Sequence, residues 1–132
     1  MKSGVFYQSC EQIAIIKQEL TALYVFCAEI NGEEIHCWKD YARIIADSFA
    51  FPTSCVESVD VYLDWIRDLT WVERDGYAII IKNYSKFLAE DPVLKSKILD
   101  HYSRIIIPWW QSEVEHCVVG GESKFFAVYL VD

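Results

Sequence analysis

The run YAIII at residues 77–81 decides the fold class, because five apolar or aromatic residues follow one another without a break. A strand with one face in water alternates apolar and polar residues, whereas a strand covered on both faces is apolar throughout. Doubly covered strands are typical of parallel sheets with helices packed on both sides. The run is therefore predicted to be an inner strand of a layered α/β fold.

Further strands and helices are predicted in alternation around this run. Strand-forming residues occur at 4–7, 23–28 and 125–131, and helical spacing of apolar residues occurs at 10–20, 38–49, 56–71 and 91–106. These elements imply an α/β fold with a small, mostly parallel sheet of about three strands flanked by helices, preceded by a short N-terminal strand–helix extension. No linker or repeat interrupts the chain, so residues 1–132 are expected to form a single domain.

The charge of the chain favours a basic protein as partner. The sequence has 132 residues with 20 acidic and 12 basic side chains, which gives a formal net charge of −8 and a pI near 4.8. Such a surface repels nucleic-acid phosphates, because their binding depends on Lys and Arg. It attracts a cationic protein and guides it during diffusion. Direct binding to nucleic acid is therefore not expected. Binding to a membrane is not expected either, since no stretch approaches the ~20 apolar residues of a spanning helix.

The cysteines indicate a reducing compartment. Cys10, Cys27, Cys37, Cys55 and Cys117 form an odd number without C-x-x-C spacing, and scattered free cysteines behave as small hydrophobic residues. The first residues do not resemble a signal peptide, because they contain no apolar core segment. A cytoplasmic protein is expected, and no motif indicates a cofactor.

A stack of acidic residues distinguishes the predicted helix 56–71. On a helical wheel, Asp60, Asp64 and Asp68 stand one above another at i, i+4 and i+8, with Glu57 beside them. Like charges at this spacing destabilise a helix by about 0.2–0.5 kcal/mol per pair. Carboxylates can hold arginine bidentately, as phosphates do, so the helix could imitate nucleic-acid phosphates inside a basic active site. The alternative is an ordinary solvated helix face.

Apolar residues flank the acidic stack. Val61 and Trp65 lie along one edge of it on the wheel, and Trp71 lies near the other. Aromatic groups next to charges that lose water on binding are the usual composition of an interface hot spot. The alternative interpretation of Trp65 is a side wall of the core. The side predicted to face the core carries Val59, Tyr62, Leu63, Ile66 and Leu69.

The region from residue 30 to residue 71 resembles the barstar family of ribonuclease inhibitors. The family pattern is an I-N-G-x-x-I turn, a helix, a proline and then a helix of the form N-x-D-A-L-x-D-x-L. The chain has INGEEI at 30–35, Pro52, and acidic residues at the matching distances. By this resemblance Asp60 and Asp64 fall on the two inhibitory aspartates of the family, and Glu57 falls on an acidic residue at the start of that helix. Longer members add a D-L-x-W segment, which residues 68–71 match.

The resemblance implies a barstar-like fold and a bacterial, cytoplasmic immunity protein of a toxin–antitoxin pair. Such a protein is not an enzyme. It forms a one-to-one complex with a basic ribonuclease-type toxin and blocks the active site of that toxin, without a cofactor or metal. The residues then expected to bind the partner are Asp60, Asp64, Glu57, Asp68, Ser54, Val61 and Trp65. Further candidates, which the resemblance does not align, are Glu113, Glu115, Trp109 and Trp110.

The chain departs from the family in the loop before this helix. Ser54-Cys55-Val56 stands where family members have an aromatic pair and a glycine. Trp65 follows the second aspartate, whereas the family tryptophan precedes it. These changes indicate a partner other than barnase. A regulatory domain that kept the fold but binds a non-nuclease partner is therefore a second interpretation.

Enzymatic or metal chemistry is the weakest interpretation. His36-Cys37 and His116-Cys117 could in principle bind zinc, but adjacent residues point in different directions and the spacing matches no zinc finger. Asp60 and Asp64 could act as paired catalytic carboxylates, yet no nucleophile elbow, P-loop or dinucleotide-binding motif occurs. The adjacent pair Trp109 and Trp110 is also conspicuous, because both side chains are not expected to point into one core.

Overall fold

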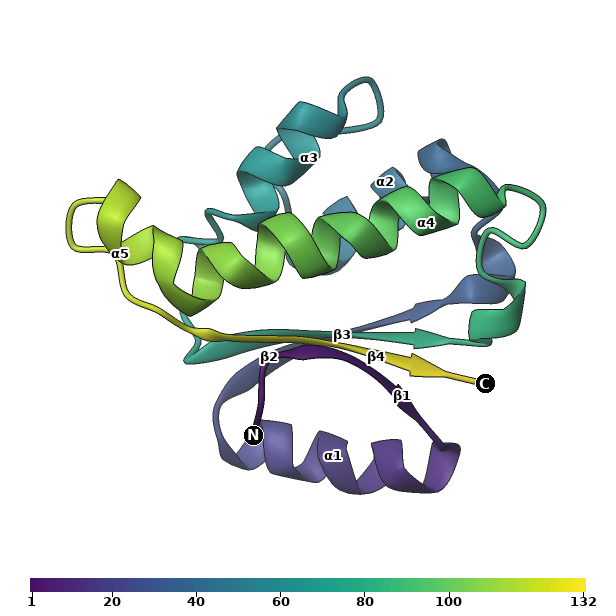
Figure 1. The fold of residues 1–132 in the computed structure, drawn as a ribbon, viewed down its shortest axis with the longest axis horizontal. Coiled ribbons are helices and arrows are strands. Elements are labelled where there is room, and N and C mark those ends of the chain that lie inside the picture. Colours follow the sequence, from purple (N-terminus) through teal and green to yellow (C-terminus); the bar gives the residue numbers. More distant parts are fainter.

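The computed structural model describes residues 1–132 and places four parallel strands in one sheet (Figure 1). The strands are β1 Gly4–Gln8, β2 Val25–Asn31, β3 Gly76–Lys82 and β4 Phe125–Val131, in the spatial order β1-β4-β3-β2. The expected α/β fold with a parallel sheet flanked by helices is confirmed. The predicted number of about three strands is too low, because the whole of β1 pairs with β4. The expected N-terminal strand and helix are present, and the strand adds a fourth member to the sheet.

β3 is the inner strand that the run at 77–81 predicts. It is hydrogen-bonded to β2 on one side and to β4 on the other, with Ile79 opposite both Ala28 and Val128. Every residue of β3 except Lys82 is buried. Alternate side chains enter two different cores, since Ile79 belongs to a cluster of 26 buried residues and Ile80 to a cluster of 8.

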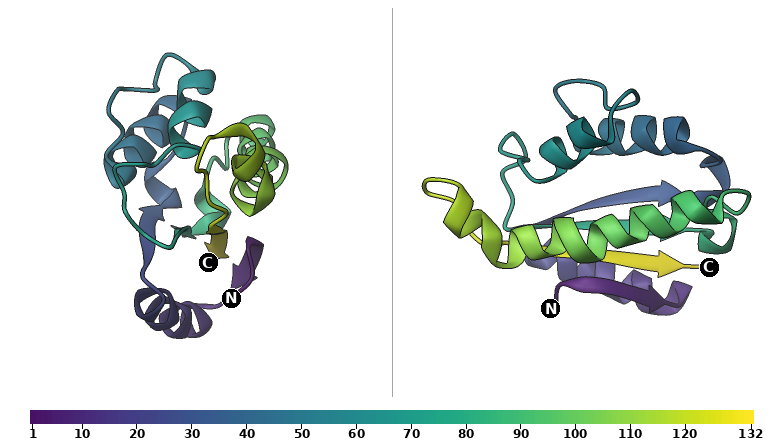
Figure 2. Two further views of the ribbon diagram at one scale, coloured as in Figure 1. Left: turned by 90° about the vertical axis from the view of Figure 1, so that its left-hand side faces the viewer. Right: turned by 45° about the horizontal axis from the view of Figure 1, so that its top comes forward.

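Helices cover the two faces of the sheet unequally. One face carries α1 Cys10–Ala22, and the other carries α2 Trp38–Phe49, α3 Val59–Ile66 and α4 Pro92–His101 (Figures 1 and 2). The larger core lies beneath the second group of helices. α3 and α1 therefore lie on opposite sides of the sheet (Figure 1). None of the helices combines the length and apolar character that a membrane span requires.

The helix that begins at Pro92 continues beyond its expected end near residue 106. Two wider π-helical turns, Tyr102–Ile106 and Trp109–Glu113, lead into the short helix α5, Val114–Cys117. They flank Pro108, whose ring would clash with a carbonyl group of a regular α-helix and whose nitrogen cannot donate a hydrogen bond. The continuation brings Trp109 into hydrogen-bonding distance of the end of α3.

Three tyrosine hydroxyls join the helices inside the larger core. The Tyr41 hydroxyl lies 2.7 Å from the Tyr62 hydroxyl and 2.5 Å from the Tyr102 hydroxyl, and all three side chains are fully buried. Burial raises the pKa of Tyr41 well above its ordinary value, so the phenol stays neutral and can donate. The three residues come from α2, α3 and the long C-terminal helix. The network therefore connects α3, through the core, to α2 and to the C-terminal helix.

Replacing the central tyrosine tests this network. Tyr41→Phe removes both hydrogen bonds and should lower the free energy of unfolding by about 2–4 kcal/mol, because buried hydroxyls lose their partner. Tyr102→Phe removes one bond and should cost about 1–2 kcal/mol. Urea unfolding of both variants measures the difference. Equal losses in the two variants would show that Tyr41 is not the centre of the network.

Candidate partner-binding surface

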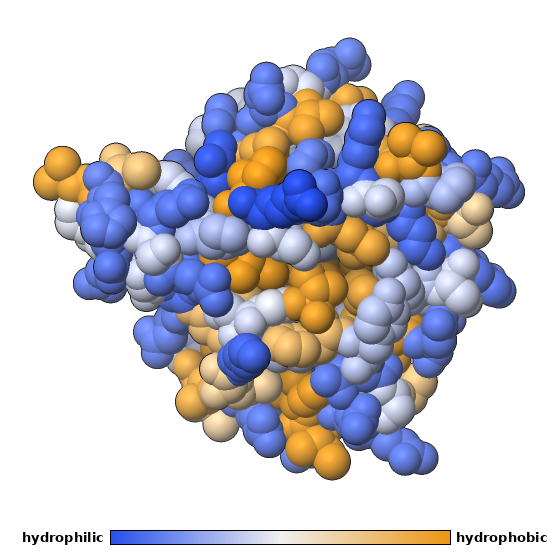
Figure 3. Space-filling model, viewed as in Figure 1, coloured by the Kyte–Doolittle hydropathy of each residue, from blue (hydrophilic) through white to orange (hydrophobic).

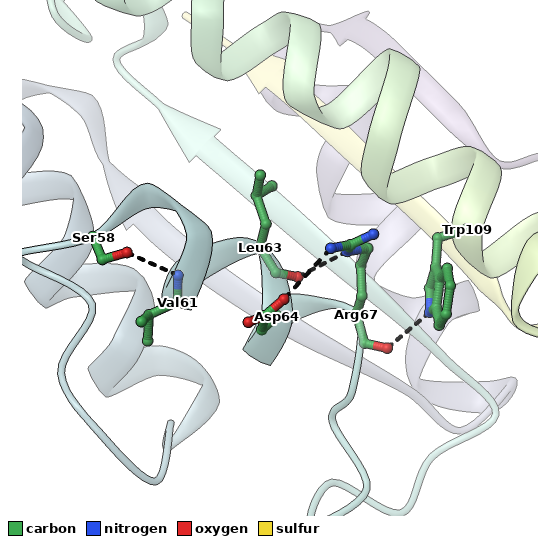
Figure 4. Close-up of polar contacts among 6 residues, drawn as sticks. All are labelled: Ser58, Val61, Leu63, Asp64, Arg67 and Trp109. Atoms are coloured by element: carbon green, nitrogen blue, oxygen red, sulfur yellow. Dashed lines mark hydrogen bonds and ion pairs between the residues drawn. The ribbon is translucent and has the colours of Figure 1, made fainter. Parts of the chain in front are cut away.

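The acidic helix is shorter than the sequence predicts. α3 spans Val59–Ile66, eight residues, in place of the expected 56–71. It begins where the Ser58 hydroxyl accepts a hydrogen bond from the Val61 amide at 3.3 Å, which is N-cap geometry (Figure 4). It ends at Arg67, and Leu69 then adopts a φ of 52°, in the left-handed region that a right-handed helix excludes.

The predicted stack of three aspartates on one helix is consequently wrong. Glu57 precedes the N-cap, and Asp68 lies beyond the last helical residue. Only Asp60 and Asp64 remain on the same helix, one turn apart. The four carboxylates still belong to one continuous segment, so they form an acidic surface in which two members are held by a helix and two by its flanking turns.

Asp60 and Asp64 are exposed to solvent. The Asp60 side chain makes no ion pair within the chain. The Asp64 side chain is 74% exposed, and its one ion pair is a 3.6 Å contact from Oδ1 to a terminal guanidinium nitrogen of Arg67 (Figure 4). Exposed pairs of this kind contribute at most about 1 kcal/mol. Both carboxylates are therefore available to an incoming cation.

The flanking carboxylates differ from each other. Glu57 is exposed and has no ion pair, whereas Asp68 is half-buried and its Oδ1 accepts a hydrogen bond from the Thr70 amide at 3.3 Å. Burial and the nearby charge of Asp68 raise the pKa of Tyr77 to about 12. Asp68 thus helps to shape the turn after α3, and it keeps less of its surface for a partner than Asp64 does.

Arg67 is fixed at the C-terminal end of α3. Its Nε donates to the Leu63 carbonyl at 3.0 Å, and the guanidinium lies 5.3 Å from the ring centre of Trp109 (Figure 4). A cation at this end of a helix also interacts favourably with the helix dipole. Because Arg67 is held by the backbone and by the indole, its contact with Asp64 orients that carboxylate without covering it.

All five tryptophans of the chain donate their indole N–H groups either to residues 49–56, which precede α3, or to the C-terminal end of α3. We call these five hydrogen bonds the indole clamps. The bonds are Trp71 to the Phe49 carbonyl (2.7 Å), Trp65 to Thr53 Oγ1 (2.8 Å), Trp38 to the Val56 carbonyl (2.9 Å), Trp110 to the Ile66 carbonyl (3.0 Å) and Trp109 to the Arg67 carbonyl (2.8 Å). The clamps hold the loop before α3 and the end of α3 in place before any partner arrives.

The adjacent tryptophans of the C-terminal helix both point toward α3, contrary to the expectation that they would diverge. Trp110 is buried at 4% exposure, and Trp109 is half-buried against the same core. Each indole donates a hydrogen bond to a backbone carbonyl at the C-terminal end of α3. The last carbonyl groups of a helix have no hydrogen-bond partner within the helix. No local pattern in the sequence indicates this role, because the donors and acceptors lie more than forty residues apart.

Ser54, Val61 and Trp65, the other residues expected to bind a partner, differ in exposure. Ser54 is exposed, and its hydroxyl accepts a hydrogen bond from the Val56 amide at 3.2 Å. Val61 is half-buried against the core, and Trp65 is half-buried with its ring 5.5 Å from that of Trp71. Trp65 therefore forms a wall of the loop and still presents an apolar edge. Val59, which was predicted to face the core, is instead 39% exposed.

Two tryptophan substitutions test the clamps. Trp110→Phe should lower the free energy of unfolding by about 1–3 kcal/mol and speed amide hydrogen exchange in α3, because a buried carbonyl loses its donor. Trp65→Phe loses a bond to an exposed threonine and should have a smaller effect. Exchange measured residue by residue in both variants makes the comparison. Unchanged exchange in α3 of Trp110→Phe would contradict a clamping role.

Comparison with known proteins adds a family to this geometry. The family model described as Barstar (barnase inhibitor) matches residues 25–120. A search of curated proteins gave no match. Two solved structures of the Aeropyrum pernix ORC2 protein, one with ADPNP and ADP and one with ADP, have a TM-score of 0.54 and 14% identity and cover 98% of this chain.

The chain spans about a third of the ORC2 chains, 34% and 35% respectively, and at this identity the similarity shows the fold alone. The family match is of a different kind. It covers well over half of the chain and includes the loop, α3 and the helix that carries Trp109 and Trp110. On this match, the chain belongs to the barstar family.

Proposed function

We propose that the protein is an inhibitor that blocks the active site of a cationic ribonuclease-type toxin with α3 and the loop before it. The observation that carries the proposal is the pair Asp60 and Asp64: two exposed carboxylates, one helical turn apart, that the chain does not neutralise with its own strong ion pairs. Members of the barstar family are barnase inhibitors, which supports the class of partner.

The chemistry of the contact follows from the charges. A ribonuclease binds phosphates through arginine, lysine and histidine side chains, and a carboxylate can occupy the same positions with charge-assisted hydrogen bonds. The net charge of −8 draws a basic partner toward the surface over long distances. Val61 and Trp65 then exclude water around the buried charges. The protein therefore competes with RNA for the phosphate-binding groups of the toxin.

The rigid backbone favours tight binding. A loop that must be ordered on association loses conformational entropy, and this loss weakens the complex. The indole clamps and the tyrosine network already fix α3 and residues 49–58 in the free protein. Less ordering is then needed on binding, which supports a one-to-one complex formed largely by rigid docking.

A bacterial cell that makes such a toxin needs the inhibitor in the same compartment. All five cysteines are free, which fits a reducing cytoplasm. The proposed role is thus that of a cytoplasmic immunity protein in a toxin–antitoxin pair. It acts by binding alone, with no catalytic step, cofactor or metal of its own.

The loop before α3 favours a second candidate, a regulatory domain for a non-nuclease partner. Cys55 is buried, with its Sγ 3.6 Å from the Ala42 carbonyl, and the exposed residues just before it, Pro52, Thr53 and Ser54, are not aromatic. The aromatic pair by which relatives would cover an active site is absent. A partner that needs no such cover would suit this loop, and the titration below separates the two candidates.

Stoichiometric inhibition is the test of the proposed function. Barnase and a panel of purified cationic bacterial ribonuclease toxins are titrated with the protein while cleavage of a fluorogenic RNA is followed. With at least one toxin, activity should fall linearly and reach zero at one equivalent of inhibitor. If every ribonuclease in the panel stays active at a large molar excess of the protein, the regulatory candidate takes precedence.

Charge-removing substitutions test the site. Asp60→Asn and Asp64→Asn should each weaken inhibition by at least about 30-fold, because losing one member of a desolvated charge pair costs ~2–5 kcal/mol. Glu11→Gln removes the same charge from α1, on the opposite side of the sheet, and should change the inhibition constant less than about threefold. Inhibition by Asp64→Asn as strong as by Glu11→Gln would exclude α3 from the contact.

A further inference from the structure

A groove with a volume of about 890 Å³ begins at Asp64 and extends away from α3. It is bounded on one side by the turn that follows α3, residues 67–75, and on the other by the loop between α5 and β4, residues 118–124. Leu69 and Trp110 contribute buried apolar surface to it. Because Asp64 lines the groove and also belongs to the proposed inhibitory surface, a partner seated on α3 lies at the mouth of the groove.

The cationic side chains of the groove are held in place by contacts within the chain. Arg67 is held by the Leu63 carbonyl and by Trp109, and it pairs with Asp64 at 3.6 Å. The Arg74 guanidinium lies 4.6 Å from the ring centre of Tyr24. Lys124 Nζ donates to the Arg74 carbonyl at 2.8 Å and lies over the ring of Tyr77. These cations serve to join the turn after α3 to the loop before β4.

Three carboxylates of the groove have no ion pair within the chain. Glu73, Asp75 and Glu122 are exposed, and none of their carboxylates makes an ion pair. With Asp64 and Asp68 they give the groove five carboxylates against three cationic side chains, those of Arg67, Arg74 and Lys124. A ligand with positive charge therefore finds unpaired carboxylates on both walls.

Exposed apolar side chains complete the surface. Val118 is 46% exposed and Val119 is fully exposed at the tip of the loop after α5. Gly120, with a φ of 73°, lets the chain turn sharply behind them. Figure 3 shows hydrophobic atoms at this extremity of the molecule, at the left of the view. Apolar groups beside acidic groups match a peptide segment that alternates basic and apolar residues.

We propose that this groove receives a second basic segment of the same toxin, in which a lysine or arginine side chain is followed by an apolar one. The inference rests on the proposed function, and it names a contact outside α3 that determines which toxin is bound. α3 presents two aspartates suited to any guanidinium-rich active site. The groove adds three further carboxylates without ion pairs, Glu73, Asp75 and Glu122, and two exposed valines, a pattern that few basic proteins match.

Nuclear magnetic resonance with a peptide tests the groove independently of any toxin. A hexapeptide of alternating leucine and arginine, added at millimolar concentration to the full protein, should shift the amide signals of Val118 and Val119 and the indole signal of Trp109. The triple variant Glu73→Gln/Asp75→Asn/Glu122→Gln should lose these shifts, and a leucine–glutamate hexapeptide should cause none. Absent or unchanged shifts would overturn the proposed groove whatever the fate of the inhibitor function.

The toxin inhibited in the titration provides the second arm. The groove variant should bind it about tenfold more weakly or worse, mainly through faster dissociation, since each exposed pair is worth roughly two- to fivefold. A control with the same net charge, Glu11→Gln/Glu34→Gln/Glu90→Gln, alters exposed residues outside the groove and should bind within about threefold of the parent.

The two variants separate failure of the groove from failure of the function. Equal affinities of the groove variant and the control variant would overturn the second contact, while loss of inhibition in Asp60→Asn would still support the inhibitory helix. If the parent protein inhibits no ribonuclease, the proposed function fails by itself, and the shifts caused by the peptide then decide whether the groove binds basic segments.

Discussion

Five indole hydrogen bonds hold α3 and the loop before it, on which the proposed function depends. α3 has eight residues, which is too short to be stable in water by itself. It also carries two aspartates at i and i+4, a spacing that disfavours the helix. The indole clamps and the Tyr62 hydroxyl supply the tertiary contacts that offset this cost. Because hydrogen bonds on the core side fix the backbone of α3, the Asp60 and Asp64 carboxylates are not needed to hold the helix and stay exposed to solvent.

The sheet supports α3 from the core side. β3 is covered on both faces, so the helices on its two sides are separated by a fully apolar layer. β1 and α1 precede the segment that the family model matches, and β4, to which β1 is hydrogen-bonded, follows it. α1 covers the face of the sheet opposite α3 (Figure 1). The acidic surface lies on the other side of the sheet, with α3 (Figure 1).

The sequence predicts the sheet and most helices because their signals are local. Each of these signals lies within the element that it predicts. They are the apolar run at 77–81, the N-cap and proline at residues 91–92, and the periodicity of 38–49. The extent of α3 is different. Helical spacing continues through residues 67–71, but the chain leaves the helix because Leu69 turns left-handed and Trp109 binds the Arg67 carbonyl. A contact across forty-two residues cannot be read from local spacing.

The central claim is that α3, already rigid in the free protein, places its two aspartates among the catalytic cations of a ribonuclease. A crystal structure of the complex with an inhibited ribonuclease tests it most directly. The account predicts Asp60 and Asp64 within about 4 Å of active-site lysine, arginine or histidine nitrogens, with the backbone of residues 49–67 unchanged from the free protein. A complex in which both carboxylates stay in solvent, or in which α1 forms the contact, would contradict it.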